Sequence, residues 1–174
     1  MKQVEWFNRE FKFSTDQNIF PSVIERLSGT PARLEEKIKS INASLLTVRL
    51  GSTWTIKENI GHLTDLEPLW QNRLEDILTG KKELRPTDLQ NTQTSQANHD
   101  AVSLQQLLDN FRKIRNTTLD LLDDITEEQV FQSALHPRLK TPMRTLDLFL
   151  FVADHDDHHL ARISEIVRLI NQQS

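Results

Sequence analysis

The chain has no cysteine and no tyrosine among its 174 residues. The absence of cysteine excludes disulfide bonds, thiolate metal ligands and a cysteine nucleophile together. Histidine and carboxylate side chains would therefore have to hold any metal, and any thiol used in chemistry would have to arrive with a substrate. Glycine is also scarce, with four residues, which disfavours many tight turns and favours a few long helices.

An excess of positive charge and long apolar runs are lacking as well. The chain has 21 lysines and arginines and 25 aspartates and glutamates, so its net charge is −4. This negative charge argues against a nucleic-acid partner. The longest apolar run, at 148–153, is far too short to cross a bilayer. The first residues lack the apolar core of a signal peptide. We therefore expect a cytoplasmic protein without a membrane partner, folded as one domain over 1–174.

Periodic apolar residues and capping signals predict four long helices and one long polar loop. The expected helices cover 21–43, 55–79, 103–124 and 141–171, with a short helix at 126–134 and the polar loop at 81–102. The first should bend near Gly29, because Thr30 and Pro31 resemble an N-cap and a first-turn proline. Thr141 and Pro142 give the same signal for the last. This pattern predicts an all-α four-helix bundle, with an aromatic N-terminal arm packed onto it.

A cluster of histidines and aspartates, ADHDDHHLARI, occupies 153–163 in the last predicted helix. On a helical wheel of about 100° per residue, His155 and His159 lie about 40° apart, on the face that carries core residues. Two imidazoles four residues apart can converge on a single ion. His158 lies to the side of this pair, and Asp157 points roughly the opposite way.

His62 is the natural third ligand, provided that the second and fourth predicted helices face each other. Three neutral imidazoles suit zinc, nickel or another late divalent metal. Three protein ligands leave a position for water or substrate, as in catalytic sites. Asp65, Asp154 or Asp156 could accept a hydrogen bond from a ligand imidazole. The alternative is a surface cluster in which Asp154, Asp156 and Asp157 simply hold protonated histidines.

Two further histidines, His99 and His136, lie in predicted loops. His136 precedes a proline, and we expect it to make a local hydrogen bond within its loop. His99 is expected to be an ordinary loop residue, although a position at the mouth of a site is the alternative.

Four segments carry a resemblance to a known family. They are ERLSGTPARLEEKI (25–38), WTIKENIGHLTDLEPLWQNRL (54–74), LRPTDLQNTQTSQANHD (84–100) and LHPRLKTPMRTLDLFLFVADHDDHHLARI (135–163). A W-[ST]-x-K-E-x-x-x-H-L segment followed by a late H-D-x-H-H-L segment is far more specific than either histidine motif. The sequence resembles the DinB-like (damage-inducible protein B) superfamily of bacterial four-helix bundles over nearly the whole chain. The resemblance implies an up-down-down-up bundle, with the long connection between the second and third helices.

The resemblance also implies a metal triad, which falls on His62, His155 and His159. Members of the family often bind nickel or zinc and are often dimers. Characterised relatives include S-transferases and isomerases that use low-molecular-weight thiols. The function implied is a divalent-metal-dependent enzyme, of the S-transferase type, that transfers an exogenous thiol to a small electrophilic substrate.

Two other functions stay open at this stage. One is metal-dependent hydrolysis, with Glu58, Asp65 or Glu67 as the base. The other is a non-catalytic stress protein that binds a metal or a ligand. A homodimer is also expected, because the start of the last helix is apolar on two sides, and either the N-terminal arm or another subunit must cover the second side.

Overall fold

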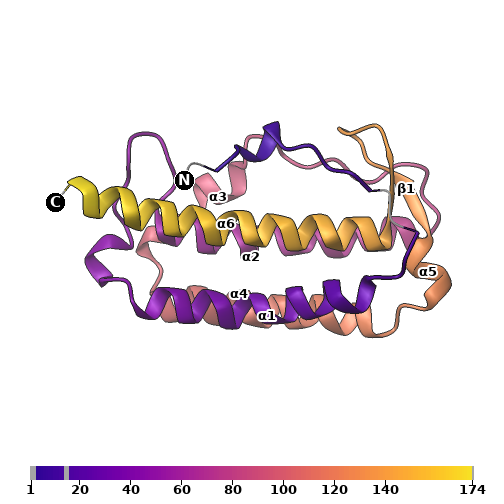
Figure 1. Ribbon diagram of the computed structural model, residues 1–174, viewed down its shortest axis with the longest axis horizontal. Coiled ribbons are helices and arrows are strands. Elements are labelled where there is room, and N and C mark those ends of the chain that lie inside the picture. Colours follow the sequence, from indigo (N-terminus) through magenta and orange to yellow (C-terminus); the bar gives the residue numbers. More distant parts are fainter. Residues whose placement is uncertain (1–2, 14–15, 174) are drawn as a thin grey trace.

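The computed structural model describes residues 3–13 and 16–173. Its long helices are α1 (Phe20–Lys39), α2 (Ile56–Leu78), α4 (Leu104–Asp123) and α6 (Thr145–Gln173). Both α1 and α2 pack against α4 and α6. In Figure 1, α1 and α6 run in one direction while α2 and α4 run in the other. The predicted all-α bundle with up-down-down-up topology is therefore confirmed.

Short elements connect the long helices. They are the 3₁₀ helices η1 (Trp6–Asn8), η2 (Ala43–Leu45) and η3 (His99–Ala101), the helices α3 (Thr92–Gln96) and α5 (Glu127–Phe131), and the strands β1 (Ser133–Leu135) and β2 (Pro142–Arg144). Capping boxes at Thr55 and Thr126 begin α2 and α5. The long polar loop predicted between α2 and α4 therefore contains two short helical turns.

The last helix begins later than the sequence suggests. Pro142 lies in β2, which pairs antiparallel with β1, rather than in the first turn of α6. The pairing is favoured because it buries Met143 completely. The backbone N–H of Thr145 still bonds the carbonyl of Gln132, at 3.0 Å. Asp147 then accepts the backbone N–H of Arg144 at the start of α6. The prediction that the last helix begins at Thr141 and Pro142 is therefore wrong, and the carboxylate of Asp147 stabilises the N-terminus of α6 instead.

The predicted internal start of α1 at Thr30 is also wrong, because α1 is continuous through Pro31. Proline has no N–H, so Pro31 leaves the carbonyl of Leu27 without its helical partner. The Nη1 atom of Arg115, on α4, donates to that carbonyl at 3.2 Å. The hydroxyl of Thr30 donates to the carbonyl of Arg26 at 3.0 Å. Side chains thus replace the missing bond, and the helix tolerates its proline.

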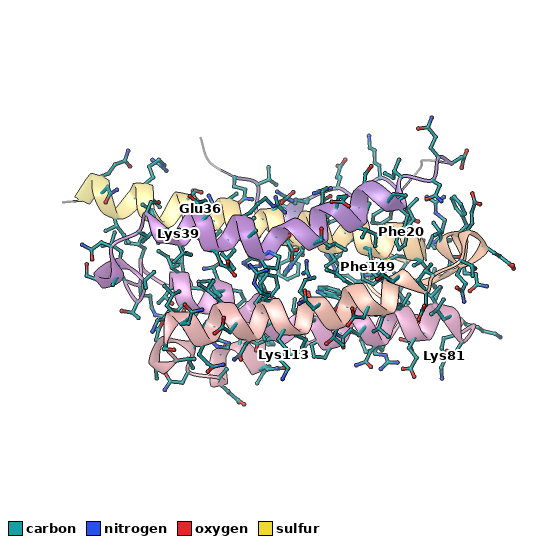
Figure 2. All side chains as sticks on the ribbon, turned by 90° about the horizontal axis from the view of Figure 1, so that it is seen from below. Phe20, Glu36, Lys39, Lys81, Lys113 and Phe149 are labelled. Atoms are coloured by element: carbon teal, nitrogen blue, oxygen red, sulfur yellow. The ribbon has the colours of Figure 1, made fainter. Side chains whose placement is uncertain are left out.

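Two apolar clusters fill the bundle, one towards each end. Figure 2 contrasts the interior with the surface: Phe149 lies between the helices, whereas Glu36 and Lys39 lie on the outside. The ring of Phe149 packs edge-on against Phe20, with 6.4 Å between ring centroids. Along α6, Ala153 belongs to one cluster and Leu160 to the other. The histidine cluster therefore lies at the junction of the two halves of the core.

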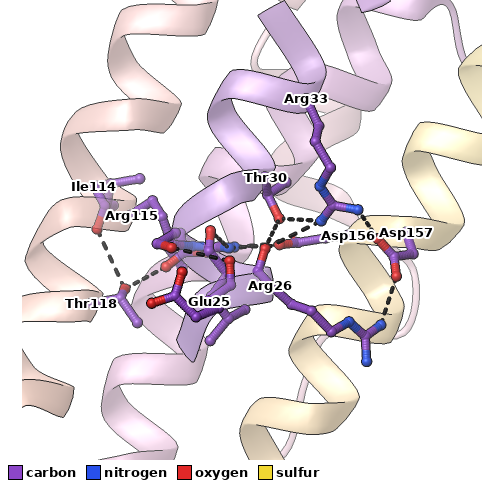
Figure 3. Close-up of polar contacts among 12 residues, drawn as sticks. Glu25, Arg26, Thr30, Arg33, Ile114, Arg115, Thr118, Asp156 and Asp157 are labelled. Atoms are coloured by element: carbon purple, nitrogen blue, oxygen red, sulfur yellow. Dashed lines mark hydrogen bonds and ion pairs between the residues drawn. The ribbon is translucent and has the colours of Figure 1, made fainter. Parts of the chain in front are cut away.

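A buried ion cluster ties the four helices together near this junction (Figure 3). Arg115 is completely buried and pairs with Glu67 on α2 and with Asp156 on α6. The hydroxyl of Thr118 donates to Glu67. Asp156 is held by Arg115 on α4, while the neighbouring His155 lies beside His62 on α2, with 5.2 Å between ring centroids. This cluster therefore sets the rotation of α6 about its axis.

The N-terminal arm, residues 3–13, covers part of α6. Trp6 and Phe11 pack on Phe151 with ring centroids 4.9 and 4.7 Å away. In Figure 1 the arm and the connection between α2 and α4 lie along the same side of the bundle, over α2 and α6. The arm therefore supplies one of the two covers that the sequence allowed. The homodimer stays a prediction, which light scattering across protein concentrations can check.

In the part of the chain that the structure describes, no helix combines the length and the apolar character needed to cross a membrane.

Candidate metal centre

Helices α2 and α6 face each other and bring His62, His155 and His159 together. One ring nitrogen of each lies within 4.8 Å of the other two, and all three residues are buried. The Nε2 atoms of His155 and His159 are 3.2 Å apart. Two Zn–N bonds of about 2.0–2.1 Å at a tetrahedral angle would separate their nitrogens by about 3.3 Å. The residues present therefore fit a late divalent metal ion, although metal binding by them stays a prediction.

Asn59 orients the imidazole of His159. Its Nδ2 donates to the carbonyl of Thr55 at 2.7 Å, so its Oδ1 faces the Nδ1 of His159, at 2.8 Å. An amide oxygen only accepts, so the His159 proton resides on Nδ1. The Nε2 atom then carries a lone pair directed at the site, as a metal ligand requires.

A chain of polar groups from the long connection orients His62 in the same way. The Nδ1 of His62 is 3.0 Å from the hydroxyl of Thr94, which itself donates to Asp65 at 2.7 Å. Because the Thr94 hydroxyl donates its proton to Asp65, its oxygen accepts the N–H at Nδ1 of His62. The Nε2 atom of His62 therefore has a lone pair that can bind a metal ion. Asp65 also contacts the Nε2 of His99, at 2.9 Å. Asp65 thus acts through Thr94 rather than on a ligand directly.

His99 reaches Asp65 because residue 61 is a glycine. A Cβ placed on Gly61 would lie 2.3 Å from the His99 ring. His99 is buried, so the expectation of an ordinary loop residue is wrong. It is not among the residues that line the cavity beside the triad, so the alternative, a place at the mouth of the site, finds no support. Its role is to hold the aspartate under the triad.

His155 differs from the other two histidines. Its Nδ1 is buried and has no hydrogen-bond partner among the described residues. Its ring is held by packing instead, with the ring centroids of Trp6 and Trp70 at 5.0 and 5.9 Å. Because His159 presents a bare Nε2, the proton of neutral His155 lies on Nε2 and is shared between the two rings. A metal ion would take the place of that proton.

Burial keeps the three imidazoles neutral. It lowers the pKa of His62 to about 4 and holds the pKa values of His155 and His159 well below the ordinary value for histidine. All three therefore offer lone pairs at neutral pH, which is the form that binds metal.

The aspartates of the cluster do not serve the imidazoles. Asp154 and Asp157 pair with Arg26, at 2.8 and 2.6 Å, and Asp156 pairs with Arg115 at 2.6 Å. The expectation that Asp154 or Asp156 accepts a bond from a ligand imidazole is therefore wrong. The alternative of a surface cluster with protonated histidines is wrong as well, because the acids bind arginines instead. Asp157 does point away from the core, as predicted.

A cavity of about 300 Å³ lies beside the triad, which is a size typical of small-molecule sites. Its apolar wall includes Trp6, Phe7, Trp54, Leu66, Trp70, Leu89 and Phe151, and its polar wall includes Asn59, Arg73, Asp88, His136, Arg138, His158 and Arg162. The predicted local bond of His136 is confirmed, since its Nδ1 accepts the backbone N–H groups of Arg138 and Leu139. His158 flanks the triad, with its ring centroid 5.3 Å from that of His159.

Sequence reasoning missed three groups that shape this site. Asn59 gave a weak signal, because it is a polar residue three positions before His62 on the same helix. Thr94 gave none, because the connection that carries it has no period. Arg73 is 1% exposed, and no pattern distinguishes it from the surface arginines of other helices.

The fold is similar to that of several solved structures. YfiT from Bacillus subtilis, described as a probable metal-dependent hydrolase with an unusual four-helix bundle topology, superposes with a TM-score of 0.78 and 22% identity over 94% of each chain. A Streptococcus pneumoniae protein gives a TM-score of 0.65 and 17% identity, covering 87% of this chain and 91% of that one. An uncharacterised protein from Clostridium difficile 630 gives 0.64 and 16%, covering 91% and 98%. At these identities the likeness shows the fold.

The family follows from the sequence itself. No curated protein sequence matches the chain. The model of the DinB superfamily, however, matches residues 26–163, a range that includes His62, His155 and His159. This range is well over half of the chain, and the bundle has the topology expected of it. The chain therefore belongs to the DinB superfamily.

Proposed function

We propose that the protein is a metal-dependent enzyme that activates an exogenous low-molecular-weight thiol and transfers it to a small electrophilic substrate. The observation that carries this proposal is the position of three buried, neutral imidazoles at the wall of a 300 Å³ cavity. Zinc or nickel held by His62, His155 and His159 would supply a Lewis acid that lowers the pKa of a thiol placed in the cavity. The thiol comes from outside, because the chain has no cysteine.

The protein's own groups would position and desolvate the reactants. Asn59 and Thr94 fix two of the imidazoles before any ligand arrives, which limits the reorganisation needed on binding. The aromatic side chains of Trp54, Trp70 and Phe151 line the cavity and would limit the access of water to the reactants. In the transfer, the thiol proton leaves to solvent and the sulfur electron pair forms the new S–C bond. The leaving group departs with the electrons of the bond that breaks.

Among the residues that the structure describes, no free carboxylate base lines the cavity, and this supports a thiol over water as the nucleophile. Glu58 pairs with Arg49, Asp65 bonds Thr94, and Glu67 belongs to the ion cluster of Arg115, so none of the three bases considered from the sequence lines the cavity. Asp88 does line it, among the residues described, but its oxygens accept two backbone N–H groups. A thiol, with an ordinary pKa of about 8.5, needs far less help to ionise than water, at about 15.7.

Metal-dependent hydrolysis is the second candidate. The support for it is the likeness of the fold to a protein described as a probable metal-dependent hydrolase. The same open metal position would then activate water instead of a thiol. Both candidate functions need the triad, so loss of metal would abolish either activity. Only the choice of substrate can distinguish thiol transfer from hydrolysis.

The test uses metal-loaded protein with two reactions. In the first, monobromobimane is mixed with cysteine or glutathione, and the fluorescent conjugate is followed. In the second, p-nitrophenyl acetate is supplied without any thiol. We expect metal-dependent conjugation above the uncatalysed rate, lost in His159→Ala. Ester turnover alone would overturn the thiol proposal in favour of hydrolysis, and inertness in both assays would leave a non-catalytic binding protein.

A matched control tests the choice of ligands. His158 is one residue from His159 and also lines the cavity, yet it is not part of the three-histidine group. The His158→Ala variant should keep its metal, whereas His159→Ala should lose it. Equal loss from both variants would show that the ligand set has been assigned wrongly.

A further inference from the structure

Arg73, on α2, is a buried cation that forms no ion pair with a carboxylate among the residues the structure describes. It is 1% exposed, its Nε donates to the carbonyl of Arg85 at 3.1 Å, and its Nη2 has no hydrogen-bond partner among the described residues. The nearby carboxylate of Asp76 is occupied, because it accepts the backbone N–H and the guanidinium of Arg85 at 2.7–2.9 Å. A buried charged donor without an acceptor is destabilising and needs an explanation.

A second donor without an acceptor faces Arg73. The Nδ1 of His136 accepts the backbone N–H groups of Arg138 and Leu139 at 3.2 and 3.1 Å, so its ring proton resides on Nε2. That Nε2 lies 3.4 Å from the Nη1 of Arg73, which can only donate. Two N–H donors therefore face each other, and neither has an acceptor within the described part of the chain. An oxyanion placed beside both nitrogens could accept from Nη1 and Nη2 of Arg73 and from Nε2 of His136.

Both residues line the cavity that contains the triad. The guanidinium carbon of Arg73 is 5.6 Å from the ring centroid of Trp70, and the Trp70 centroid is 5.9 Å from that of His155. Arg73 and His155 therefore both lie beside the ring of Trp70. The exposed Arg138, with its guanidinium carbon 5.3 Å from the ring centroid of Phe7, adds positive charge to the same wall.

We propose that Arg73 and His136 bind the oxyanion of a small-molecule ligand, a carboxylate or a phosphate, whose body lies along Trp70 and whose other end reaches the triad. The guanidinium fork offers two parallel N–H groups to two oxygens of such a group. The neutral N–H of His136 adds a third donor. This inference rests on the proposed function, because it identifies the substrate or the thiol of the transfer as an organic anion.

The test compares ligands that differ in charge and share a phenyl ring. Phenylacetate, phenyl phosphate and the neutral phenylacetamide are titrated into protein by calorimetry. Metal-free protein is used, so that binding of an oxyanion to the metal cannot imitate the result. We expect at least one anion to bind ten-fold or more tightly than phenylacetamide, and the better anion identifies the group as carboxylate or phosphate. Equal affinities for all three ligands would overturn the proposal.

Variants assign the preference to Arg73. Arg73→Met keeps an unbranched, flexible side chain and removes the charge, so the preference for the anion should fall at least ten-fold. Arg162→Gln is the matched control, because Arg162 lines the same cavity but already pairs with Glu165, and its preference should persist. A purely structural role of Arg73 would lower the thermal midpoint and leave the anion preference intact, which would also overturn the proposal.

Failure of this proposal and failure of the proposed function are separate results. The anion preference is read without metal and without turnover. An Arg73→Lys variant, which keeps the charge but loses the two-pronged geometry, should retain part of the preference. If Arg73→Met and Arg73→Lys both behave as the unchanged protein does in these titrations, the oxyanion is bound elsewhere and the proposal is wrong, whatever the enzyme assays show.

Discussion

Two arginines are buried almost completely in this bundle, at 0% and 1% exposure, and their surroundings are opposite. Arg115 pairs with Glu67 and Asp156 and also donates to the carbonyl of Leu27. Arg73 has one backbone acceptor and a donor facing it. Both arginines lie on long helices and point into the core. Their burial is therefore similar, and the difference between them is in their hydrogen-bond and ion-pair partners.

The difference separates a structural region from a binding region. Around Arg115, charges that fold together satisfy one another and fix the packing of four helices. Around Arg73 and the triad, polar groups are buried without partners, as at the Nη2 of Arg73 and the Nδ1 of His155. A protein tolerates such groups where a ligand completes them. We therefore expect the polar groups around the cavity to favour ligand binding at a cost in folding stability. We expect no such cost from the groups around Arg115.

The largest expected effect compares the two arginines directly. Arg115→Met leaves two buried carboxylates unpaired and should lower the free energy of unfolding by about 3–5 kcal/mol. Arg73→Met removes an unpaired buried charge, so its effect should be within about 1 kcal/mol and can be stabilising. Urea unfolding of metal-free protein measures both. Equal losses from the two variants would break the comparison.

Two buried threonines give the next contrast. Thr94→Val removes the hydroxyl that orients His62, and loss of such an outer partner typically weakens metal binding by about 10–100-fold. Thr118→Val removes a donor to Glu67, so it should lower the stability by about 1–3 kcal/mol and leave metal affinity unchanged. Competition with a chromophoric chelator measures the affinity. The reverse pattern would contradict the roles given to the two regions.

Two helical glycines give a smaller effect. Gly29→Ala meets nothing within 4 Å and should stabilise α1 by about 0.5–1 kcal/mol. Gly61→Ala gains the same helix propensity, but its Cβ would lie 2.3 Å from His99 and would displace that ring from Asp65. We expect this variant to be no more stable than the unchanged protein and to bind metal less tightly. A thermal midpoint raised equally by both substitutions would show that His99 does not pack as described.

The last prediction concerns the dependence of stability on pH. Burial, and then the charges of Arg73, Arg138 and Lys140, lower the pKa of His136 to about 4. The unfolded chain takes up this proton near pH 6.5, before the folded protein does, so the contribution to stability is present above about pH 6.5 and is lost as the pH falls towards 4. The slope from this one proton is below about 1.4 kcal/mol per pH unit.

His136→Asn supplies the control for this pH dependence. An amide oxygen can replace the Nδ1 atom as the acceptor of the loop N–H groups, but it does not titrate. The stability of this variant should fall less steeply between pH 6.5 and 4 than that of the unchanged protein. Identical slopes would mean that His136 is not a neutral donor in the cavity.

The helical face of His155 and His159 could be predicted from sequence because helical spacing is local. An angle of about 100° per residue places two side chains on one face whatever the rest of the chain does. The start of α6 was predicted wrongly because the pairing of β2 with β1 competes with helix initiation at Pro142, and that pairing depends on distant residues. The continuity of α1 likewise depends on Arg115, which comes from another helix.

The groups around the triad could not be predicted for the same reason. His62, Thr94 and His99 meet only after the connection between α2 and α4 folds back along the bundle, and its residues have no period that indicates this path. The orphaned donors of Arg73 and His136 become visible only when partners can be counted in space. The sequence therefore predicts the candidate metal ligands, whereas the groups that orient them and the groups that face them are found only in the structure.

Metal analysis of protein purified without a histidine tag tests the central claim most directly. The account predicts about one zinc or nickel ion per chain, and a His155→Ala/His159→Ala double variant that folds but retains none. Stoichiometric metal in that double variant would contradict the assignment of the site to His62, His155 and His159.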